Sequence, residues 1–88
     1  MDYTVRIKRK IERRLEKLPQ RVQDLFYQLV EDLREKGPVQ PHWPNYSRLG
    51  KNEYHCHLTY RYVACWRHEE ESIIVEVYYV GSREKAPY

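Results

Sequence analysis

The sequence predicts a single α+β domain that covers residues 1–88, with the order strand, helix, helix, strand, strand, strand. A length of 88 residues suits one domain. Apolar residues recur at helical spacing in the first half of the chain and at a period of two in the second half. We therefore expect an antiparallel sheet with two N-terminal helices packed on one of its faces.

The first half of the chain is expected to form a strand and two helices. Apolar residues alternate with polar ones over 3–7, which is typical of a half-buried strand. A short amphipathic helix follows over 11–18, and Pro19 can both end it and begin the next helix. One continuous apolar stripe runs over 22–33, and Gly37 ends this second helix.

Three strands are expected in the second half, over 54–58, 61–67 and 73–80. Their short connections predict an antiparallel meander. Residues 58–62 contain no Gly, Asn or Asp, so a wide turn or a bulge is expected there in place of a tight hairpin. The proline-rich segment 37–48 reads as a connecting loop that its aromatic residues pack down.

Charge and cysteine content narrow the class of protein. The net charge is +3, and residues 37–68 hold four Lys or Arg against one Asp or Glu, together with all four histidines. A cationic segment is compatible with a polyanion partner but does not require one. Two cysteines make no disulfide framework, and no apolar run is long enough to span a membrane. We expect a cytoplasmic protein with no membrane partner.

His55 and His57 are two residues apart on a predicted strand, so their side chains share one face. If Tyr54, Cys56 and Leu58 are core, both imidazoles lie on the open face. Two neighbouring histidines can act as general base and general acid near neutral pH. The same pattern also fits two solvated histidines. A zinc site needs further ligands, and Cys56 points to the other face, so no metal or cofactor is expected.

Two arginines and a tyrosine are the next candidate site residues. Arg61 opens the strand after the histidine strand, and Arg83 follows the last strand. The planar fork of a guanidinium matches the oxygens of a phosphate, although each arginine alone is equally compatible with an ordinary surface. Tyr88 can stack on a base or orient a reacting group. Lys51, just before the histidine strand, can add attraction for phosphate.

Five segments, in this order and spacing, resemble the RelE type of toxin within the RelE/ParE superfamily. They are Leu49-Gly50, the run Tyr-His-Cys-His-Leu over 54–58, Tyr-Arg-Tyr-Val over 60–63, Val-Gly-Ser-Arg-Glu over 80–84, and Tyr88. The resemblance covers essentially the whole chain, and its C-terminal half carries the specificity.

The resemblance implies the toxin of a toxin–antitoxin system that acts as an endoribonuclease, an mRNA interferase. In such toxins a basic strand pair, two arginines and a C-terminal tyrosine occupy the positions of His55, His57, Arg61, Arg83 and Tyr88. It implies attack of the ribose 2′-oxygen on the adjacent phosphate, giving a 2′,3′-cyclic phosphate without a metal. Several members cut messenger RNA on the ribosome, and a cognate antitoxin protein is the expected partner.

Two alternatives remain at this point. A ParE-like toxin has the same fold and poisons gyrase without cutting RNA, because fold does not fix function. A catalytically inactive module would bind an antitoxin and cut nothing. The histidine pair argues against a pure binder, which has no use for paired acid–base groups. RNA cleavage, DNA breaks or normal growth on expression distinguishes the three.

Overall fold

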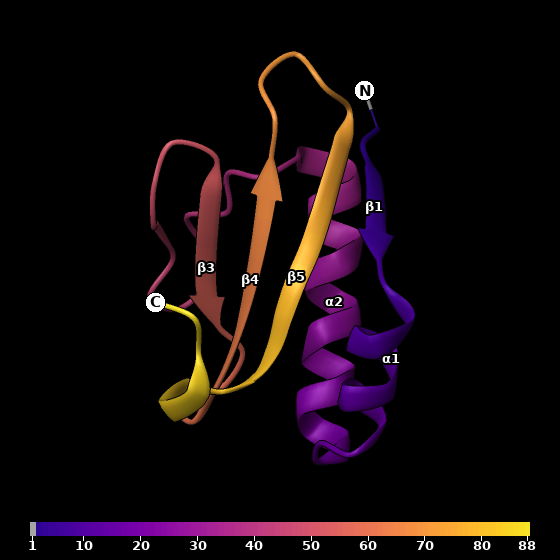
Figure 1. The fold of residues 1–88 in the computed structure, drawn as a ribbon, viewed down its shortest axis with the longest axis vertical. Coiled ribbons are helices and arrows are strands. Elements are labelled where there is room, and N and C mark those ends of the chain that lie inside the picture. The colour runs from indigo at the N-terminus through magenta and orange to yellow at the C-terminus, as the bar shows by residue number, and fades with distance from the viewer. Residues whose placement is uncertain (1) are drawn as a thin grey trace.

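The computed structural model describes residues 2–88, and its fold is α+β, as the sequence predicts (Figure 1). The elements in chain order are β1 (Thr4–Ile7), α1 (Arg9–Glu16), α2 (Gln20–Lys36), β2 (Ser47–Arg48), β3 (Glu53–His57), β4 (Tyr62–His68), β5 (Ile74–Ser82) and the short 3₁₀ turn η1 (Arg83–Lys85). The five strands form one sheet in the order β1-β5-β4-β3-β2.

The sheet is mixed, which corrects the expectation of a purely antiparallel sheet. β3, β4 and β5 form the predicted antiparallel meander, but β1 pairs with β5 in parallel, with Thr4 opposite Ile74. The two helices return the chain over one face of the sheet so that β3 runs in the direction of β1, and the antiparallel meander then gives β5 that same direction beside β1. The two-residue strand β2 adds an edge beside β3 that the sequence did not predict.

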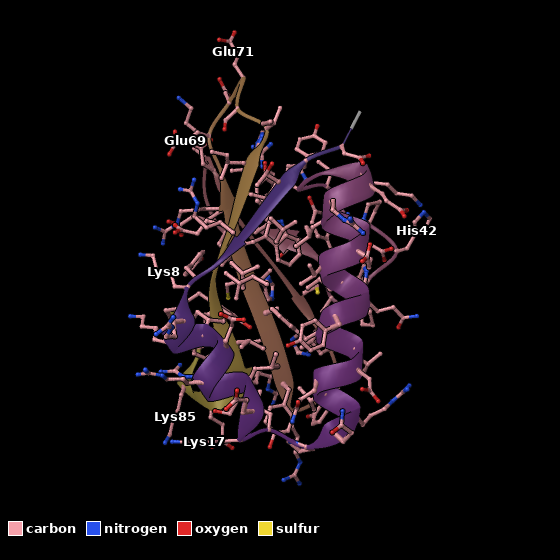
Figure 2. All side chains as sticks on the ribbon, turned by 90° about the vertical axis from the view of Figure 1, so that its right-hand side faces the viewer. Lys8, Lys17, His42, Glu69, Glu71 and Lys85 are labelled. Carbon is pink, nitrogen blue, oxygen red and sulfur yellow. The ribbon has the colours of Figure 1, made fainter. Side chains whose placement is uncertain are left out.

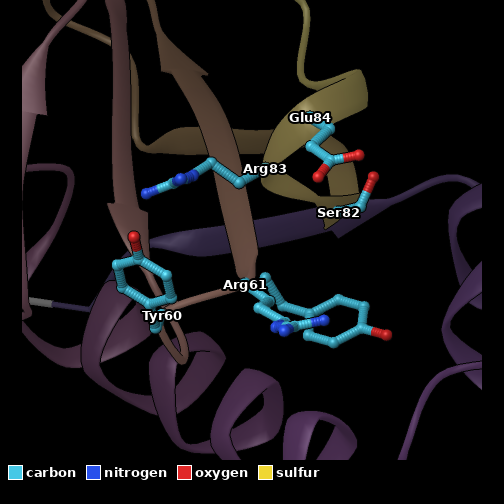
Figure 3. A pocket seen from close by; sticks show the side chains of 6 residues that line it. Tyr60, Arg61, Ser82, Arg83 and Glu84 are labelled. Atoms are coloured by element: carbon cyan, nitrogen blue, oxygen red, sulfur yellow. The ribbon is translucent and has the colours of Figure 1, made fainter.

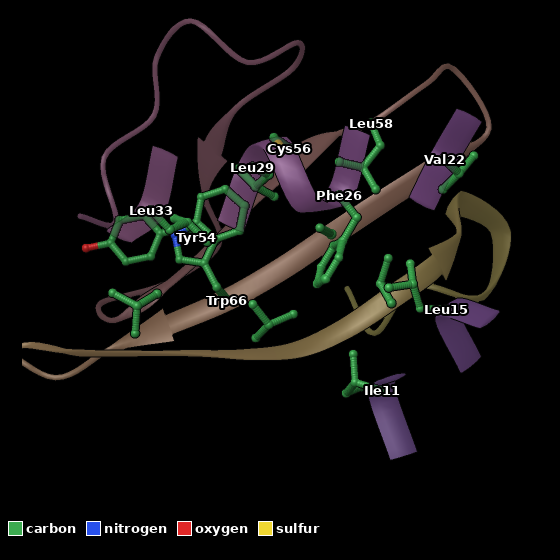
Figure 4. Packing of buried hydrophobic residues seen from close by; sticks show 14 residues of the cluster. Ile11, Leu15, Val22, Phe26, Leu29, Leu33, Tyr54, Cys56, Leu58 and Trp66 are labelled. Carbon is green, nitrogen blue, oxygen red and sulfur yellow. The ribbon is translucent and has the colours of Figure 1, made fainter. Parts of the chain in front are cut away.

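Both helices pack on one face of the sheet and bury the main core there (Figures 1 and 4). Ile11 and Leu15 are buried from α1, and Phe26 and Leu29 from α2, at the helical spacing that the sequence shows. From the sheet they meet residues of β3, β4 and β5, among them Tyr54, Cys56, Ala64, Trp66, Val75 and Val77. The predicted core face of the histidine strand is therefore confirmed.

The loop between α2 and β2 is held against the core by aromatic side chains, as expected. Trp43 donates a hydrogen bond from Nε1 to the Asp32 carboxylate (2.9 Å) and packs on the core cluster. Buried Trp66 donates from its own Nε1 to the carbonyl of Pro38 (3.0 Å). These bonds fix the loop that leads into β2, and β2 in turn lies beside His55.

Two irregularities interrupt the meander, a wide turn at the end of the sheet that carries the site and a bulge in the middle of β5. Residues 58–61 form the wide turn that the sequence predicts, closed by hydrogen bonds from the backbone N–H of Leu58 and of Thr59 to the carbonyl of Tyr62. The register between β4 and β5 also shifts by one residue, so that Tyr78 is an extra residue on β5. A bulge turns consecutive side chains toward the same face. Consistent with this, Tyr78 and Tyr79 both pack on the small cluster that lies away from the helices.

Candidate active site

His55 and His57 lie on the sheet face away from the helices, with ring centroids 5.9 Å apart. Strand alternation accounts for the shared face, since Cys56 between them points into the main core. The pairing of these two side chains on one face agrees with the sequence analysis.

That face is covered at the histidines, which corrects the expectation of an open one. His55 is 8% exposed and His57 is 6% exposed. Tyr88 lies over His55 with ring centroids 4.5 Å apart, and Ser47 of β2 hydrogen-bonds His55 Nδ1 at 3.0 Å. The sequence did not reveal this cover because it comes from β2 and from the segment after β5.

Burial lowers the pKa of His55 below its ordinary value, and the nearby His57 lowers it further. Hydrogen bonding with Ser47 opposes this shift in part. The imidazole of His55 is therefore neutral at neutral pH and can accept a proton. Two like charges at this separation would repel, so simultaneous protonation of both rings is disfavoured.

Arg61 and Arg83 line one pocket of about 300 Å³, which we call the arginine pocket (Figure 3). The backbone N–H of Arg83 donates to the carbonyl of Arg61 at 2.8 Å, which joins the segment after β5 to the turn before β4. Arg61 lies in this turn and not in β4, where the sequence analysis had placed it. Both side chains are exposed, and in Figure 3 their tips point in different directions.

Tyr60 is a site residue that the sequence analysis missed. It stands at the turn and is 72% exposed, and the guanidinium of Arg83 lies over its ring, 4.5 Å from the centroid (Figure 3). A rigid aromatic ring beside an arginine is a surface on which a nucleotide base can stack. The signal was present in the sequence as an aromatic residue in a turn, but nothing there placed it opposite Arg83.

The histidine pair does not line the arginine pocket, so the site consists of two adjoining groups. Tyr88 lies between the histidine pair and the arginine pocket, because its ring contacts His55 and the charge of Arg83 affects the pKa of its phenol. Burial raises the pKa of the Tyr88 phenol, and the Arg83 guanidinium partly offsets that rise. Arg83 and Tyr88 are therefore close enough for their charges to interact.

Lys51 is not brought to this site. It lies before β3, at the opposite end of that strand from the turn that holds Arg61. It lines a separate pocket together with Glu53, Arg67 and Glu69, where both signs of charge are present. A role for Lys51 in binding RNA therefore has no geometric support from the arginine pocket.

Both cysteines are buried, and burial raises the pKa of Cys65 to about 12, so a thiolate does not form at neutral pH. Among residues 2–88, no three His, Cys, Asp or Glu side chains gather closely enough to hold a metal ion. Neither helix in that range has both the length and the apolar character to cross a bilayer.

Comparison with known proteins gives a match at the level of structure. No protein-family model and no curated protein matches the sequence. A chain of the archaeal RelE–RelB complex from Pyrococcus horikoshii OT3 matches with a TM-score of 0.77 and 19% identity, over 98% of this chain and 100% of that chain. A mutant E. coli toxin RelE in the free state matches with a TM-score of 0.75 and 18% identity, over 98% and 88%.

A third match gives the same result. A chain of the toxin–antitoxin complex RelBE2 from Mycobacterium tuberculosis matches with a TM-score of 0.70 and 23% identity, over 94% of this chain and 100% of that chain. Each of these structural matches covers most of this chain and most of the chain with which it is compared. Together with the strand order and the covering helices, they show that this chain has the RelE-like toxin fold.

Proposed function

We propose that this protein is the toxin of a toxin–antitoxin system and that it cleaves messenger RNA. The main observation in support of this proposal is that the arginine pocket lies next to the histidine pair. Arg61 and Arg83 share a pocket of a size that suits a nucleotide, and Tyr88, in the segment after Arg83, lies against His55. Phosphate-binding groups thus adjoin acid–base groups, as cleavage of RNA requires.

The proposed reaction is an internal transfer within the RNA. His55, which is neutral because it is buried, takes the proton from the ribose 2′-hydroxyl. The 2′-oxygen bonds to the adjacent phosphorus as the bond from phosphorus to the 5′-oxygen breaks, and His57 gives a proton to that oxygen. The products are a 2′,3′-cyclic phosphate and a 5′-hydroxyl. Arg61 and Arg83 stabilise the extra negative charge on the phosphorane.

RNA can reach His55 only if Tyr88 moves off its imidazole. Tyr88 is 53% exposed and follows the short η1 turn, so its ring can swing away without breaking the sheet. In the displaced position it can stack on a base beside Tyr60. The proposal therefore assigns Tyr88 a positioning role.

A small antitoxin protein is the proposed partner. Two of the structures that share this fold are complexes of a toxin with its antitoxin, which supports a partner of the same kind for this chain. The proposal extends to RNA on the ribosome, where several toxins of this type act.

A second candidate follows from the burial of the histidines. A protein in which Tyr88 and Ser47 keep His55 covered would bind its target without cutting RNA, as a gyrase-poisoning toxin or an inactive antitoxin-binding module does. The experiment below separates this candidate from the nuclease.

The test is primer extension on cellular messenger RNA after brief induction of the chain. Wild type is compared with Arg83→Ala, with His55→Ala/His57→Ala, and with Arg13→Ala as a control on the exposed side of α1. We expect new cuts with wild type and Arg13→Ala, and a loss of about a hundredfold or more in each site variant, in the range of single acid–base groups and charge-stabilising donors. Circular dichroism of the purified variants checks that they are folded.

The other outcomes separate the alternatives. Cuts that persist in Arg83→Ala would contradict the proposed phosphate site. Growth arrest with DNA breaks and no RNA cuts would indicate gyrase poisoning. Normal growth without cuts of either kind would indicate an inactive module.

A further inference from the structure

A second groove adjoins the arginine pocket on the side of helix α1. We call it the α1 groove; its volume is about 530 Å³, and its lining consists of Arg14, Leu18, Tyr62, Tyr79, Gly81, Ser82 and Lys85. Tyr62 and Ser82 line both the α1 groove and the arginine pocket, so the two hollows meet at these residues. A ligand that fills the arginine pocket can continue directly into the groove.

The floor of the α1 groove is rigid. Tyr79 is 7% exposed, and its hydroxyl donates a hydrogen bond to the carbonyl of Ser82 at 2.7 Å. Gly81 allows this position, because a Cβ there would lie 2.8 Å from the Tyr79 hydroxyl oxygen. The guanidinium of Arg14 lies over the Tyr79 ring, 5.4 Å from its centroid, and is thus held at the wall of the groove.

The charge of the groove is positive and is not neutralised. Its lining includes Arg14 and Lys85 and no carboxylate, whereas the pockets beside Lys51 and beside Arg6 both contain glutamates. The ion pairs within residues 2–88 involve Lys8, Arg34 and Arg67, and none involves Arg14 or Lys85. An anionic ligand would therefore meet two cations that have no competing partner.

The charge distribution of the whole molecule favours the same side. Figure 2 shows that Lys8, Lys17 and Lys85 project from the side that carries α1, whereas Glu69 and Glu71 lie at the far end of the sheet. A polyanion is attracted to the α1 side and repelled from the β4–β5 turn.

We infer that the α1 groove binds a second backbone phosphate of the RNA strand whose scissile phosphate lies in the arginine pocket. The inference rests on the proposed function and extends it by assigning an additional subsite. Arg14 and Lys85 contact the phosphate, and Tyr62, at the junction of the two hollows, offers its ring to the base between them. An acidic protein segment would satisfy the charges but would make less use of the aromatic junction.

The test measures binding of RNA that cannot be cleaved. Fluorescence anisotropy is recorded for a labelled dinucleotide and a labelled octanucleotide, both 2′-O-methylated, across a range of salt concentrations. Wild type is compared with Arg14→Gln/Lys85→Gln and with the control Arg13→Gln/Lys36→Gln, which removes the same charge from exposed positions outside both hollows. The conservative variant Arg14→Lys/Lys85→Arg keeps both charges.

We expect wild type to bind the octanucleotide more tightly than the dinucleotide. Arg14→Gln/Lys85→Gln should weaken octanucleotide binding about tenfold or more, the loss expected for charged contacts to phosphate. It should also reduce the salt dependence by about 0.7 per phosphate released from contact. Dinucleotide binding should not change, and the control and the conservative variant should resemble wild type.

Three results would overturn the inference. They are octanucleotide binding that is unaffected in Arg14→Gln/Lys85→Gln, an equal loss in the control Arg13→Gln/Lys36→Gln, and, with a labelled oligoglutamate peptide as a third probe in the same assay, a loss of peptide binding without a loss for RNA. Cleavage by wild type is measured separately. If wild type cleaves RNA but Arg14→Gln/Lys85→Gln binds the octanucleotide normally, only this inference is contradicted. If the variant loses octanucleotide binding but wild type does not cleave RNA, only the proposed nuclease is contradicted.

Discussion

The contact between Tyr88 and His55 determines what the histidine can do in the folded protein. The ring of Tyr88 covers the imidazole, and burial favours its neutral form, whereas the hydrogen bond with Ser47 acts in the opposite direction. A neutral imidazole is a competent base, but only when the same cover moves aside. The Tyr88 ring thus affects both the access of RNA to His55 and the pKa of its imidazole.

Replacing Tyr88 tests that relation directly. In Tyr88→Ala the pKa of His55 should rise toward its ordinary value of 6.5, because burial is the largest cause of its depression. The measurement is an NMR titration of the His55 ring protons against pH. Tyr60→Ala, which removes an exposed tyrosine from the turn, is the control. An unchanged His55 titration in Tyr88→Ala would show that Tyr88 is not the cover.

The depressed pKa of His55 also predicts how stability depends on pH. Unfolding returns the imidazole to water, where its pKa is higher, so the unfolded state binds more protons just below pH 6.5. The free energy of unfolding should therefore decrease as the pH falls below about 6.5. Urea denaturation at several pH values should show a weaker decrease in His55→Gln than in wild type or in His42→Gln, whose imidazole is exposed. Equal slopes in all three proteins would contradict this.

At the scale of elements, the end of α2 depends on one glycine. Gly37 has a φ of +86°, and its N–H donates to the carbonyl of Leu33 at 2.8 Å, which closes the helix. The ring of Tyr3, just before β1, packs against it so closely that a Cβ would lie 2.6 Å from a ring carbon. Gly37 therefore both ends α2 and contacts Tyr3, the residue that precedes β1.

Gly37→Ala should lower the free energy of unfolding by about 1–3 kcal/mol, because an alanine is strained at this φ and the Tyr3 ring must shift. The matched control is Gly50→Ala, where a Cβ would meet nothing within 4 Å. Its effect should stay within about 0.5 kcal/mol. Chemical denaturation followed by circular dichroism measures both. Equal stabilities would mean that the Tyr3 contact is not maintained in solution.

The elements were more predictable from the sequence than the site was. Helical spacing predicted α1 and α2, and alternation placed Cys56 in the core and His55 opposite it, because these patterns are local. The parallel pairing of β1 with β5, the strand β2 and the cover of His55 by Tyr88 join residues far apart in the sequence. No local pattern encodes such pairings, so the burial of the histidines could not be predicted.

At the scale of the whole molecule, one core connects nearly every element. The main cluster draws on both helices and on β3, β4 and β5, and β1 packs against it. Trp66 is fully buried at its centre, and Trp43 packs from the loop (Figure 4). The second cluster within residues 2–88 is small and comes from β4 and β5, which also contribute to the main core.

Unfolding should therefore occur in a single cooperative transition. The far-ultraviolet circular dichroism reports the helices, and tryptophan fluorescence reports Trp66 and Trp43. In a urea titration the two signals should give the same midpoint. Separate midpoints would show that the helices or the sheet retain structure independently.

The pairing of the first strand with the last also bears on when during its synthesis the protein acquires its fold. β1 and the two helices leave the ribosome first, but β5, the neighbour of β1 in the sheet, is the last strand to be made. Until then the apolar faces of the helices have no complete sheet to cover. A chain interrupted before β5 lacks the strand that pairs with β1, and one interrupted between β5 and Tyr88 can form the sheet but lacks the residue that covers His55.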